Sequence, residues 1–225
     1  MPIPALSLTA HRRPPARGGA PRRLVMFLHG YGADGQDLLG LAPYWAQALP
    51  DCAFVSPDAP FPCEMGFGWQ WFGFQGLEQA AIVAGARAAA NLLDAFIDEE
   101  LERHKLSEAS LALVGFSQGS MMALQVAPRR ARAVAGVVGF SGALVDGEAL
   151  AAEARSRPPV LLVHGEADTV VPIESLAAAE AGLAAAGLPV RTLARPGLAH
   201  SIDEAGLRAG GQFLAEAFAA AGTVS

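Results

Sequence analysis

A serine lies between two glycines in the stretch LVGFSQGSMMAL, residues 113–124. The segment Gly115–Gly119 fits the pattern G-x-S-x-G, with an apolar run before it and helix-forming residues after it. In that context the pattern is typical of a sharp strand-to-helix turn that strains the serine backbone and exposes the hydroxyl. We therefore expect Ser117 to be a nucleophile. The alternative is a glycine-rich turn in which the serine only caps the helix.

Another serine follows an apolar run in the sequence GFSG, at Ser141. Position 143 is an alanine where the pattern needs glycine, and the segment GALVDGEAL does not begin a helix directly. We interpret Ser141 as a strand-end residue near the site and not as the nucleophile.

A serine hydroxyl is a poor nucleophile until a base takes its proton. The sequence has five histidines: His11, His29, His104, His164 and His200. The elbow pattern predicts the chain order serine, acid, histidine, which excludes the first three. His164 ends the run VLLVHG and leaves little room for an acid before it. His200, in the loop RPGLAHSID, is therefore the expected base, and His29 is interpreted as a residue that fixes its own loop.

The acid that orients the base is expected after the apolar run that ends at His164. The segment HGEADTVVP offers Glu166 and Asp168. Asp168 lies farther past the strand and precedes the turn into the next helix, so it is the expected acid. Glu166, as an exposed turn residue, is the alternative, and Asp146 after the preceding strand is a second one.

A tetrahedral intermediate also needs hydrogen-bond donors for its oxyanion. One expected donor is the backbone N–H of Gln118, the residue after the nucleophile. The other is expected in the glycine-rich segment LHGYGADG, where the backbone N–H of Tyr31 is best placed.

Strand and helix patterns alternate along the chain. Apolar runs predict strands, and apolar residues at helical spacing predict helices. The expected strands cover 23–30, 52–57, 110–116, 133–140, 158–165 and 190–196, and the expected helices 34–49 (with Asp34 as N-cap), 77–105, 118–127, 173–186 and 204–220. This alternation predicts an α/β fold with a mostly parallel sheet covered by helices on both faces. We expect one domain over residues 1–225, with an edge strand and a hairpin-like, turn-rich loop in residues 1–22.

Composition favours a globular protein over a disordered one. The 225 residues are 52% hydrophobic and 17% charged, with a net charge of −6. This balance argues against nucleic acid as a partner, since no basic run is present. The start of the chain lacks the basic stretch of a signal peptide, and the longest apolar run is too short to span a bilayer. We expect a cytoplasmic protein without stable membrane insertion, with Cys52 and Cys63 as free thiols.

The motifs together resemble one enzyme family. FLHGYGADG, GWQWFGF, GFSQGSMMAL, HGEADTVVP and GLAHSI occur in the order seen in the phospholipase/carboxylesterase family of α/β-hydrolases, which includes the acyl-protein thioesterases. The resemblance implies an α/β-hydrolase without a large cap domain that hydrolyses esters, lysophospholipids or acyl thioesters and uses no cofactor. By motif, Ser117, Asp168 and His200 carry over as the triad, with Tyr31 and Gln118 as oxyanion donors. Tyr31 replaces the smaller aliphatic residue common in the family.

The expected activity is hydrolysis of short- to medium-chain acyl esters through an acyl-enzyme, without a metal ion. An acyl-protein thioesterase or a lysophospholipase is the alternative, ahead of a peptidase or a non-catalytic binding module. The sequence leaves open whether two copies form a homodimer. Aromatic residues after the strand at 52–57 suit a wall for the acyl chain, with Trp69, Trp71 and Phe72 as expected contacts. For Phe72, packing over the core is an equal alternative.

Overall fold

A seven-stranded sheet organises the chain in the computed structural model, which describes residues 8–74, 76 and 78–222. The strand order is β1-β3-β2-β6-β7-β8-β9. The strands are β1 (Ala10–Arg13), β2 (Arg23–Leu28), β3 (Cys52–Pro57), β6 (Leu111–Phe116), β7 (Gly136–Phe140), β8 (Val160–Gly165) and β9 (Val190–Arg195). All neighbours are parallel except β1, which is antiparallel to β3. The carboxyl ends of the parallel strands therefore meet at one edge, where ligands bind in such sheets.

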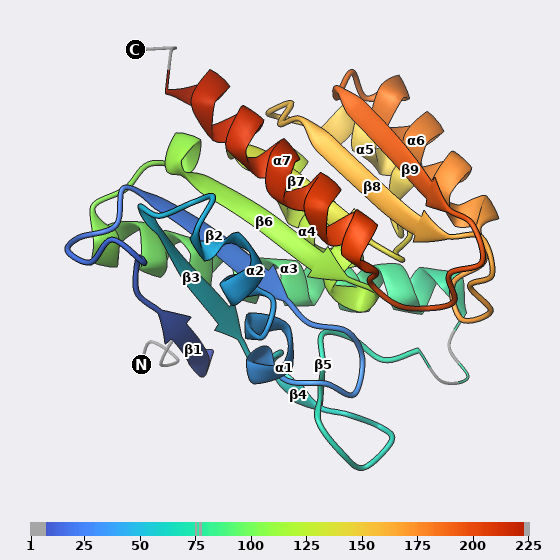
Figure 1. Cartoon of the computed structure of the whole chain (residues 1–225). Coiled ribbons are helices and arrows are strands. Elements are labelled where there is room, and N and C mark those ends of the chain that lie inside the picture. Colours follow the sequence, from blue (N-terminus) through green and yellow to red (C-terminus); the bar gives the residue numbers. More distant parts are fainter. Residues whose placement is uncertain (1–7, 75, 77, 223–225) are drawn as a thin grey trace.

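Helices cover both faces of the sheet (Figure 1). One face carries α3 (Gln79–His104), α4 (Gln118–Val126), α5 (Gly147–Glu153) and α6 (Glu174–Ala185). The other carries α1 (Gly35–Leu39), α2 (Ala42–Ala46) and α7 (Glu204–Ala221). Alternate residues of β2 enter the two cores, Met26 on the α3–α4 side and Phe27 on the α7 side. The continuous apolar run is thus explained by burial on both faces, and the expected fold class is confirmed.

Three local expectations need correction. The helix expected at 34–49 is two short helices, because the chain turns at Gly40–Leu41 and Pro43 starts a new first turn. The loop after β1 is not hairpin-like, because β1 pairs with β3 and the loop crosses to β2. Helix α5 (Gly147–Glu153) is a third departure, since no helix was expected there.

Asp34 caps α1 as expected, accepting from the N–H of Asp37 at 2.9 Å. Residues 1–7 of the expected N-terminal segment, and Leu77 at the expected start of α3, lie outside the described residues.

Helix α3 is long and apolar enough, by length and composition, to cross a membrane. Buried core helices of globular proteins have the same properties, so composition alone does not separate the two cases. Here Ala86, Leu93 and Ile97 pack in the core beside the sheet, while Arg87 and Asp94 form ion pairs with other elements. The helix acts as one layer of the fold.

A buried carboxylate fastens the edge strand β1 to α3. The side chain of Glu100 is fully buried and accepts hydrogen bonds from Arg12 at 2.6 and 3.2 Å and from Arg103 at 2.9 Å. Burial by itself would raise the pKa of Glu100, but the bonds from the two guanidinium groups outweigh it and lower the pKa. The cluster therefore stabilises the fold only while Glu100 is ionised.

We predict that Glu100→Gln lowers the free energy of unfolding by about 2 kcal/mol at pH 7, because the neutral amide loses the charge-assisted hydrogen bonds from Arg12 and Arg103. A carboxylate with a lowered pKa in the folded state contributes fully above its unfolded pKa, about 4.3 for glutamate, and loses this contribution as the pH falls through the folded value. The difference between wild type and variant, measured by urea unfolding, should therefore shrink below about pH 4.3. Exposed Glu102→Gln on the same helix is the control. An equal difference at pH 3 and pH 7 would contradict the role of the charge.

Candidate active site

Ser117 occupies a sharp turn between β6 and α4, as the pattern predicts. Its backbone has φ 54° and ψ −118°, in the left-handed half of conformational space that side chains rarely adopt. The N–H of Ser117 donates to the carbonyl of Phe140 at the end of β7, at 2.9 Å. The expected strand and helix on either side are confirmed, and the strained serine lies at the carboxyl edge of the sheet.

Close backbone contacts explain both glycines of the motif. A Cβ atom at Gly119 would lie 1.8 Å from the carbonyl oxygen of Leu28, at the end of β2. A Cβ atom at Gly115 would lie 2.3 Å from the backbone of Gly119. Neither position has room for a side chain, so only glycine lets α4 begin directly against the neighbouring strand.

The two expected oxyanion donors lie on segments that meet at this turn. A Cβ atom at Gly30 would lie 3.4 Å from Cβ of Ser117, so the loop after β2 runs beside the serine. Within residues 8–74, 76 and 78–222, the N–H of Tyr31 in that loop has no hydrogen-bond acceptor. Gln118 is the first residue of α4, and its N–H therefore has no acceptor within the helix.

The side chain of Tyr31 turns toward the segment after β3. Its hydroxyl donates to Glu64 at 2.9 Å, and its ring lies 5.8 Å from the ring of Phe74. Burial and the bond to Glu64 raise the pKa of Tyr31, so the hydroxyl stays protonated. The ring is thus held by two contacts, and only the backbone of Tyr31 is left to act beside the serine.

Asp168 is bonded to His200 through a short, buried contact. Its Oδ2 atom lies 2.7 Å from Nδ1 of His200, and its Oδ1 atom accepts from the N–H groups of Val170 and Val171, both at 2.9 Å. Burial of Asp168 would raise its pKa, but these three bonds outweigh the effect and lower the pKa. The carboxylate therefore stays ionised and can orient His200 and stabilise its cation.

Backbone contacts between two loops bring the acid and the histidine together. A Cβ atom at Gly165 would lie 2.2 Å from the carbonyl oxygen of Leu198, and the N–H of Ala167 donates to that carbonyl at 2.9 Å. The ring of His200 lies 4.9 Å from that of Phe116, the residue before the serine. The histidine loop is thereby held between the acid loop and the serine turn.

The alternative site residues lie elsewhere or are occupied. Glu166 is exposed, and Asp146 is bonded to the guanidinium groups of Arg87 and Arg129. His164 is buried, with Nε2 donating to the carbonyl of Val171 at 2.8 Å and lying 3.5 Å from Oδ2 of Asp168. Sequence reasoning missed this second histidine beside the acid. Its place at the end of the strand, four residues before Asp168, was the available signal.

Ser141 follows β7 and shares unusual features with Ser117. Its φ is 48°, and it is 1% exposed, against 9% for Ser117. Its hydroxyl has no hydrogen-bond partner among the residues described. A Cβ atom at the next residue, Gly142, would lie 3.2 Å from the carbonyl oxygen of Ser117, so Ser141 lies near the site, as expected. Its hydroxyl is nevertheless withdrawn from solvent.

The aromatic segment forms a hairpin that was not expected, with strands β4 (Phe61–Pro62) and β5 (Trp69–Gln70). Trp69 is 37% exposed and pairs its backbone with Ala33, close to the loop of Tyr31. Trp71 and Phe72 are 0% and 2% exposed. These two rings have almost no surface with which to contact a substrate, so their expected contact with the acyl chain is revised to packing.

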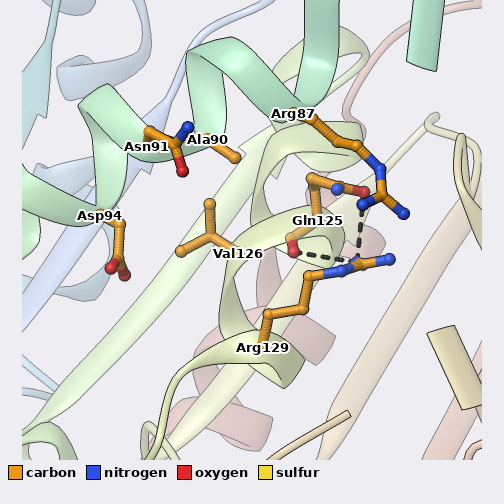
Figure 2. A pocket seen from close by; sticks show the side chains of 7 residues that line it. All are labelled: Arg87, Ala90, Asn91, Asp94, Gln125, Val126 and Arg129. Atoms are coloured by element: carbon orange, nitrogen blue, oxygen red, sulfur yellow. Dashed lines mark hydrogen bonds between the residues drawn. The ribbon is translucent and has the colours of Figure 1, made fainter. Parts of the chain in front are cut away.

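A cavity of about 340 Å³ lies between α3 and α4, and Figure 2 shows its lining. The lining residues are Arg87, Ala90, Asn91, Asp94, Gln125, Val126 and Arg129. None of the expected catalytic residues is among them. The two arginines are neutralised by Asp146 and Glu153.

In the part of the chain that the structure describes, no group of three or more His, Cys, Asp or Glu side chains could hold a metal ion.

Comparison with known proteins identifies the family. The family model described as Phospholipase/Carboxylesterase matches residues 16–217. The chain belongs to the phospholipase/carboxylesterase family. Its fold is that of the α/β-hydrolases, and its family makes it a hydrolase of carboxylic esters.

Individual family members agree with this assignment. The crystal structure of esterase PE8 superposes with a TM-score of 0.89 at 39% identity, covering 94% of this chain and 99% of that one. Esterase YpfH of Escherichia coli is 28% identical over 81% of this chain and 77% of its own length. Acyl-protein thioesterase 1 of Gibberella zeae is 26% identical over 79% of this chain and 83% of its own length.

We predict that Ser117→Ala abolishes ester hydrolysis, by about 10⁴-fold or more, without loss of the fold, because it removes only the attacking oxygen. Ser141→Ala should keep most of the activity. The measurement is the steady-state rate on p-nitrophenyl acetate, with thermal unfolding as the check on the fold. Retained activity in Ser117→Ala together with its loss in Ser141→Ala would refute the assignment.

We also predict that removal of the His200 imidazole abolishes ester hydrolysis, because the serine proton then has no acceptor at the site. The His200→Ala variant should lose about 10⁴-fold in kcat. The His164→Gln variant, which keeps a donor for the Val171 carbonyl, should retain most of the activity. Full activity of His200→Ala would exclude His200 as the base.

Proposed function

We propose that the chain hydrolyses short- to medium-chain acyl esters through an acyl-enzyme formed on Ser117. The observation that carries the proposal is the Asp168–His200 pair, bonded at 2.7 Å and held by Phe116 next to a serine in strained backbone geometry. Structural aspartate–histidine pairs are common. A strained serine at a helix start beside such a pair is the arrangement that acyl transfer requires.

The reaction proceeds in two halves. His200 takes the proton of Ser117 as the serine oxygen attacks the acyl carbonyl, and Asp168 stabilises the histidine cation. The N–H groups of Tyr31 and Gln118 donate to the oxyanion of the tetrahedral intermediate. The histidine then protonates the leaving alcohol. Water activated by His200 hydrolyses the acyl-enzyme and regenerates the serine.

Thioester hydrolysis is a second candidate function, favoured by the similarity to acyl-protein thioesterase 1 of Gibberella zeae. The same nucleophile and oxyanion donors would attack a thioester carbonyl. Lysophospholipids are further candidates in this family. A non-catalytic binding module is not favoured, since the chain carries the serine, acid and histidine in the order of the α/β-hydrolase triad. A peptidase is not favoured, since the similar proteins are named esterases and thioesterases.

The acyl chain is proposed to lie along the exposed side of the hairpin. Phe67 and Trp69 are 64% and 37% exposed, and Met65 and Phe67 lie over Gly32, next to the Tyr31 donor. Apolar side chains beside the reacting carbonyl favour an acyl group over a polar one. An open hairpin covers part of a chain, which favours short and medium lengths.

The remaining parts of the proposal concern the surroundings of the enzyme. Both cysteines are free and buried, and burial raises the pKa of Cys52 to about 12, so this thiol stays protonated. Free thiols suit a reducing compartment, and the proposed location is the cytoplasm. The substrate is a small molecule, and we propose neither a nucleic acid partner nor stable membrane insertion. The mechanism above uses no cofactor and no metal. Whether two copies form a homodimer is tested by measuring the mass of the protein in solution.

A panel of p-nitrophenyl esters from acetyl to palmitoyl, with octanoyl thioester alongside, tests the function. We predict the highest kcat/KM at short to medium length. Trp69→Ala should lower kcat/KM for octanoyl at least about fourfold more than for acetyl, since one methylene contact is worth about 0.8 kcal/mol. Tyr44→Ala, an exposed aromatic on α2, is the control and should change neither. An equal loss at both lengths would remove Trp69 from the acyl site, and higher kcat/KM for the thioester would favour the second candidate.

A further inference from the structure

The side chain of Gln118 makes two hydrogen bonds that take no direct part in the proposed reaction steps. Its Oε1 atom accepts from the N–H of Trp71 at 2.8 Å, and its Nε2 atom donates to the carbonyl of Phe72 at 2.7 Å. The residue is fully buried. Helix α4 is therefore bonded, from its first residue, to the aromatic segment that follows the hairpin, 46 positions earlier in the chain.

The aromatic segment is bonded in turn to the loop after β2. The indole Nε1 of Trp71 donates to the carbonyl of His29 at 3.1 Å, and the rings of the two residues lie 5.8 Å apart. His29 stands two positions before Tyr31. A continuous set of buried contacts thus joins the residue that carries one expected oxyanion donor to the loop that carries the other.

His29 is itself held in one protonation state. Its Nε2 atom lies 2.9 Å from the N–H of Ala59, which can only donate, so Nε2 accepts and the proton is on Nδ1. Nδ1 then donates to the carbonyl of Gly30 at 2.7 Å. Burial lowers the pKa of His29, and the ring stays neutral. Two groups therefore hold the loop of His29: the N–H of Ala59, just after β3, and the indole N–H of Trp71.

We propose that Gln118 is a positioning residue, whose side chain acts through Trp71 to set the distance between the oxyanion donors Tyr31 and Gln118. This inference rests on the proposed function. Oxyanion donors act only when they lie about 2.7–3.1 Å from the developing charge. A shift of about 1 Å at a reacting group can cost about 100-fold in rate. Trp71 thereby acts on the rate of the chemical step and not on the binding of the acyl chain.

The test compares two tryptophans with the same local chemistry. Trp71→Phe keeps an aromatic ring and removes the indole N–H. Trp45→Phe is the matched control, because Trp45 is also buried and its Nε1 donates to the carbonyl of Leu207 at 2.9 Å, in the core on the other face of the sheet. Tm, kcat and KM are measured for both, with acetyl and octanoyl p-nitrophenyl esters.

Both variants should lose similar thermal stability, but only Trp71→Phe should lose kcat, by about tenfold. The loss should be equal for the two esters, with KM unchanged within about twofold, because the oxyanion is common to all substrates. Affinity for a trifluoromethyl ketone, whose adduct with the serine carries an oxyanion, should fall by the same factor. The shape of the pH–rate profile should not change, since Gln118 and Trp71 do not titrate and His29 stays neutral.

Gln118→Met removes both side-chain bonds and keeps the backbone N–H. Its kcat should fall about 10- to 100-fold. The double variant with Trp71→Phe should fall little further, since both changes break one chain of contacts. If Trp71→Phe does not fold, Gln118→Met carries the same expectation with the ring in place.

Three results would overturn the inference. One is a Trp71→Phe variant with no greater loss of kcat than Trp45→Phe. Another is a loss confined to KM that grows with acyl length, which would mean that Trp71 touches the acyl chain. The third is a strictly multiplicative double variant. Failure of the proposed function looks different, because the wild-type protein itself would then hydrolyse no ester and Ser117 would not react with a fluorophosphonate.

Discussion

The contact between Gly119 and the carbonyl of Leu28 holds the first turn of α4 against the end of β2. Because a side chain at position 119 would overlap this carbonyl, the helix can begin here only with glycine. The contact places Ser117 and Gln118 next to the loop that contains Tyr31. Beside this contact Ser117 keeps a left-handed backbone, a conformation that costs on the order of 1–3 kcal/mol and persists only when packing imposes it.

The acid and the histidine depend on a similar approach of backbone to backbone. Gly165 ends β8 so close to Leu198 that a side chain would overlap its carbonyl. A backbone hydrogen bond therefore joins the Asp168 loop to the His200 loop, although the two are far apart in the sequence. The carboxylate of Asp168 thus lies within hydrogen-bond distance of the imidazole of His200. Buried His164 lies against Asp168 from inside the sheet and holds the loop at Val171. Short loops on a rigid sheet thus give the site its geometry.

The aromatic segment links substrate recognition to the catalytic geometry. Its exposed part, at Phe67 and Trp69, borders the oxyanion loop, whereas Trp71 and Phe72 are enclosed between that loop and α4. One stretch of sequence with a uniform aromatic character therefore has two surroundings. The buried residues Trp71 and Phe72 are constrained by their hydrogen bonds to His29 and Gln118. The exposed side chains can be substituted to suit a substrate without breaking these bonds.

The sequence by itself determined the features that depend on neighbouring residues. Apolar runs defined the parallel strands, and the pattern around Ser117 defined the turn, because backbone sterics act over a few residues. Contacts between distant segments could not be read this way. The sequence favoured Asp168 over Asp146, but only the tertiary structure showed which carboxylate contacts His200. Only the tertiary structure paired β1 with β3 and buried Trp71 while leaving Trp69 exposed. Each of these depends on which backbones approach one another across the sheet, and the spacing of residues along the chain does not encode that approach.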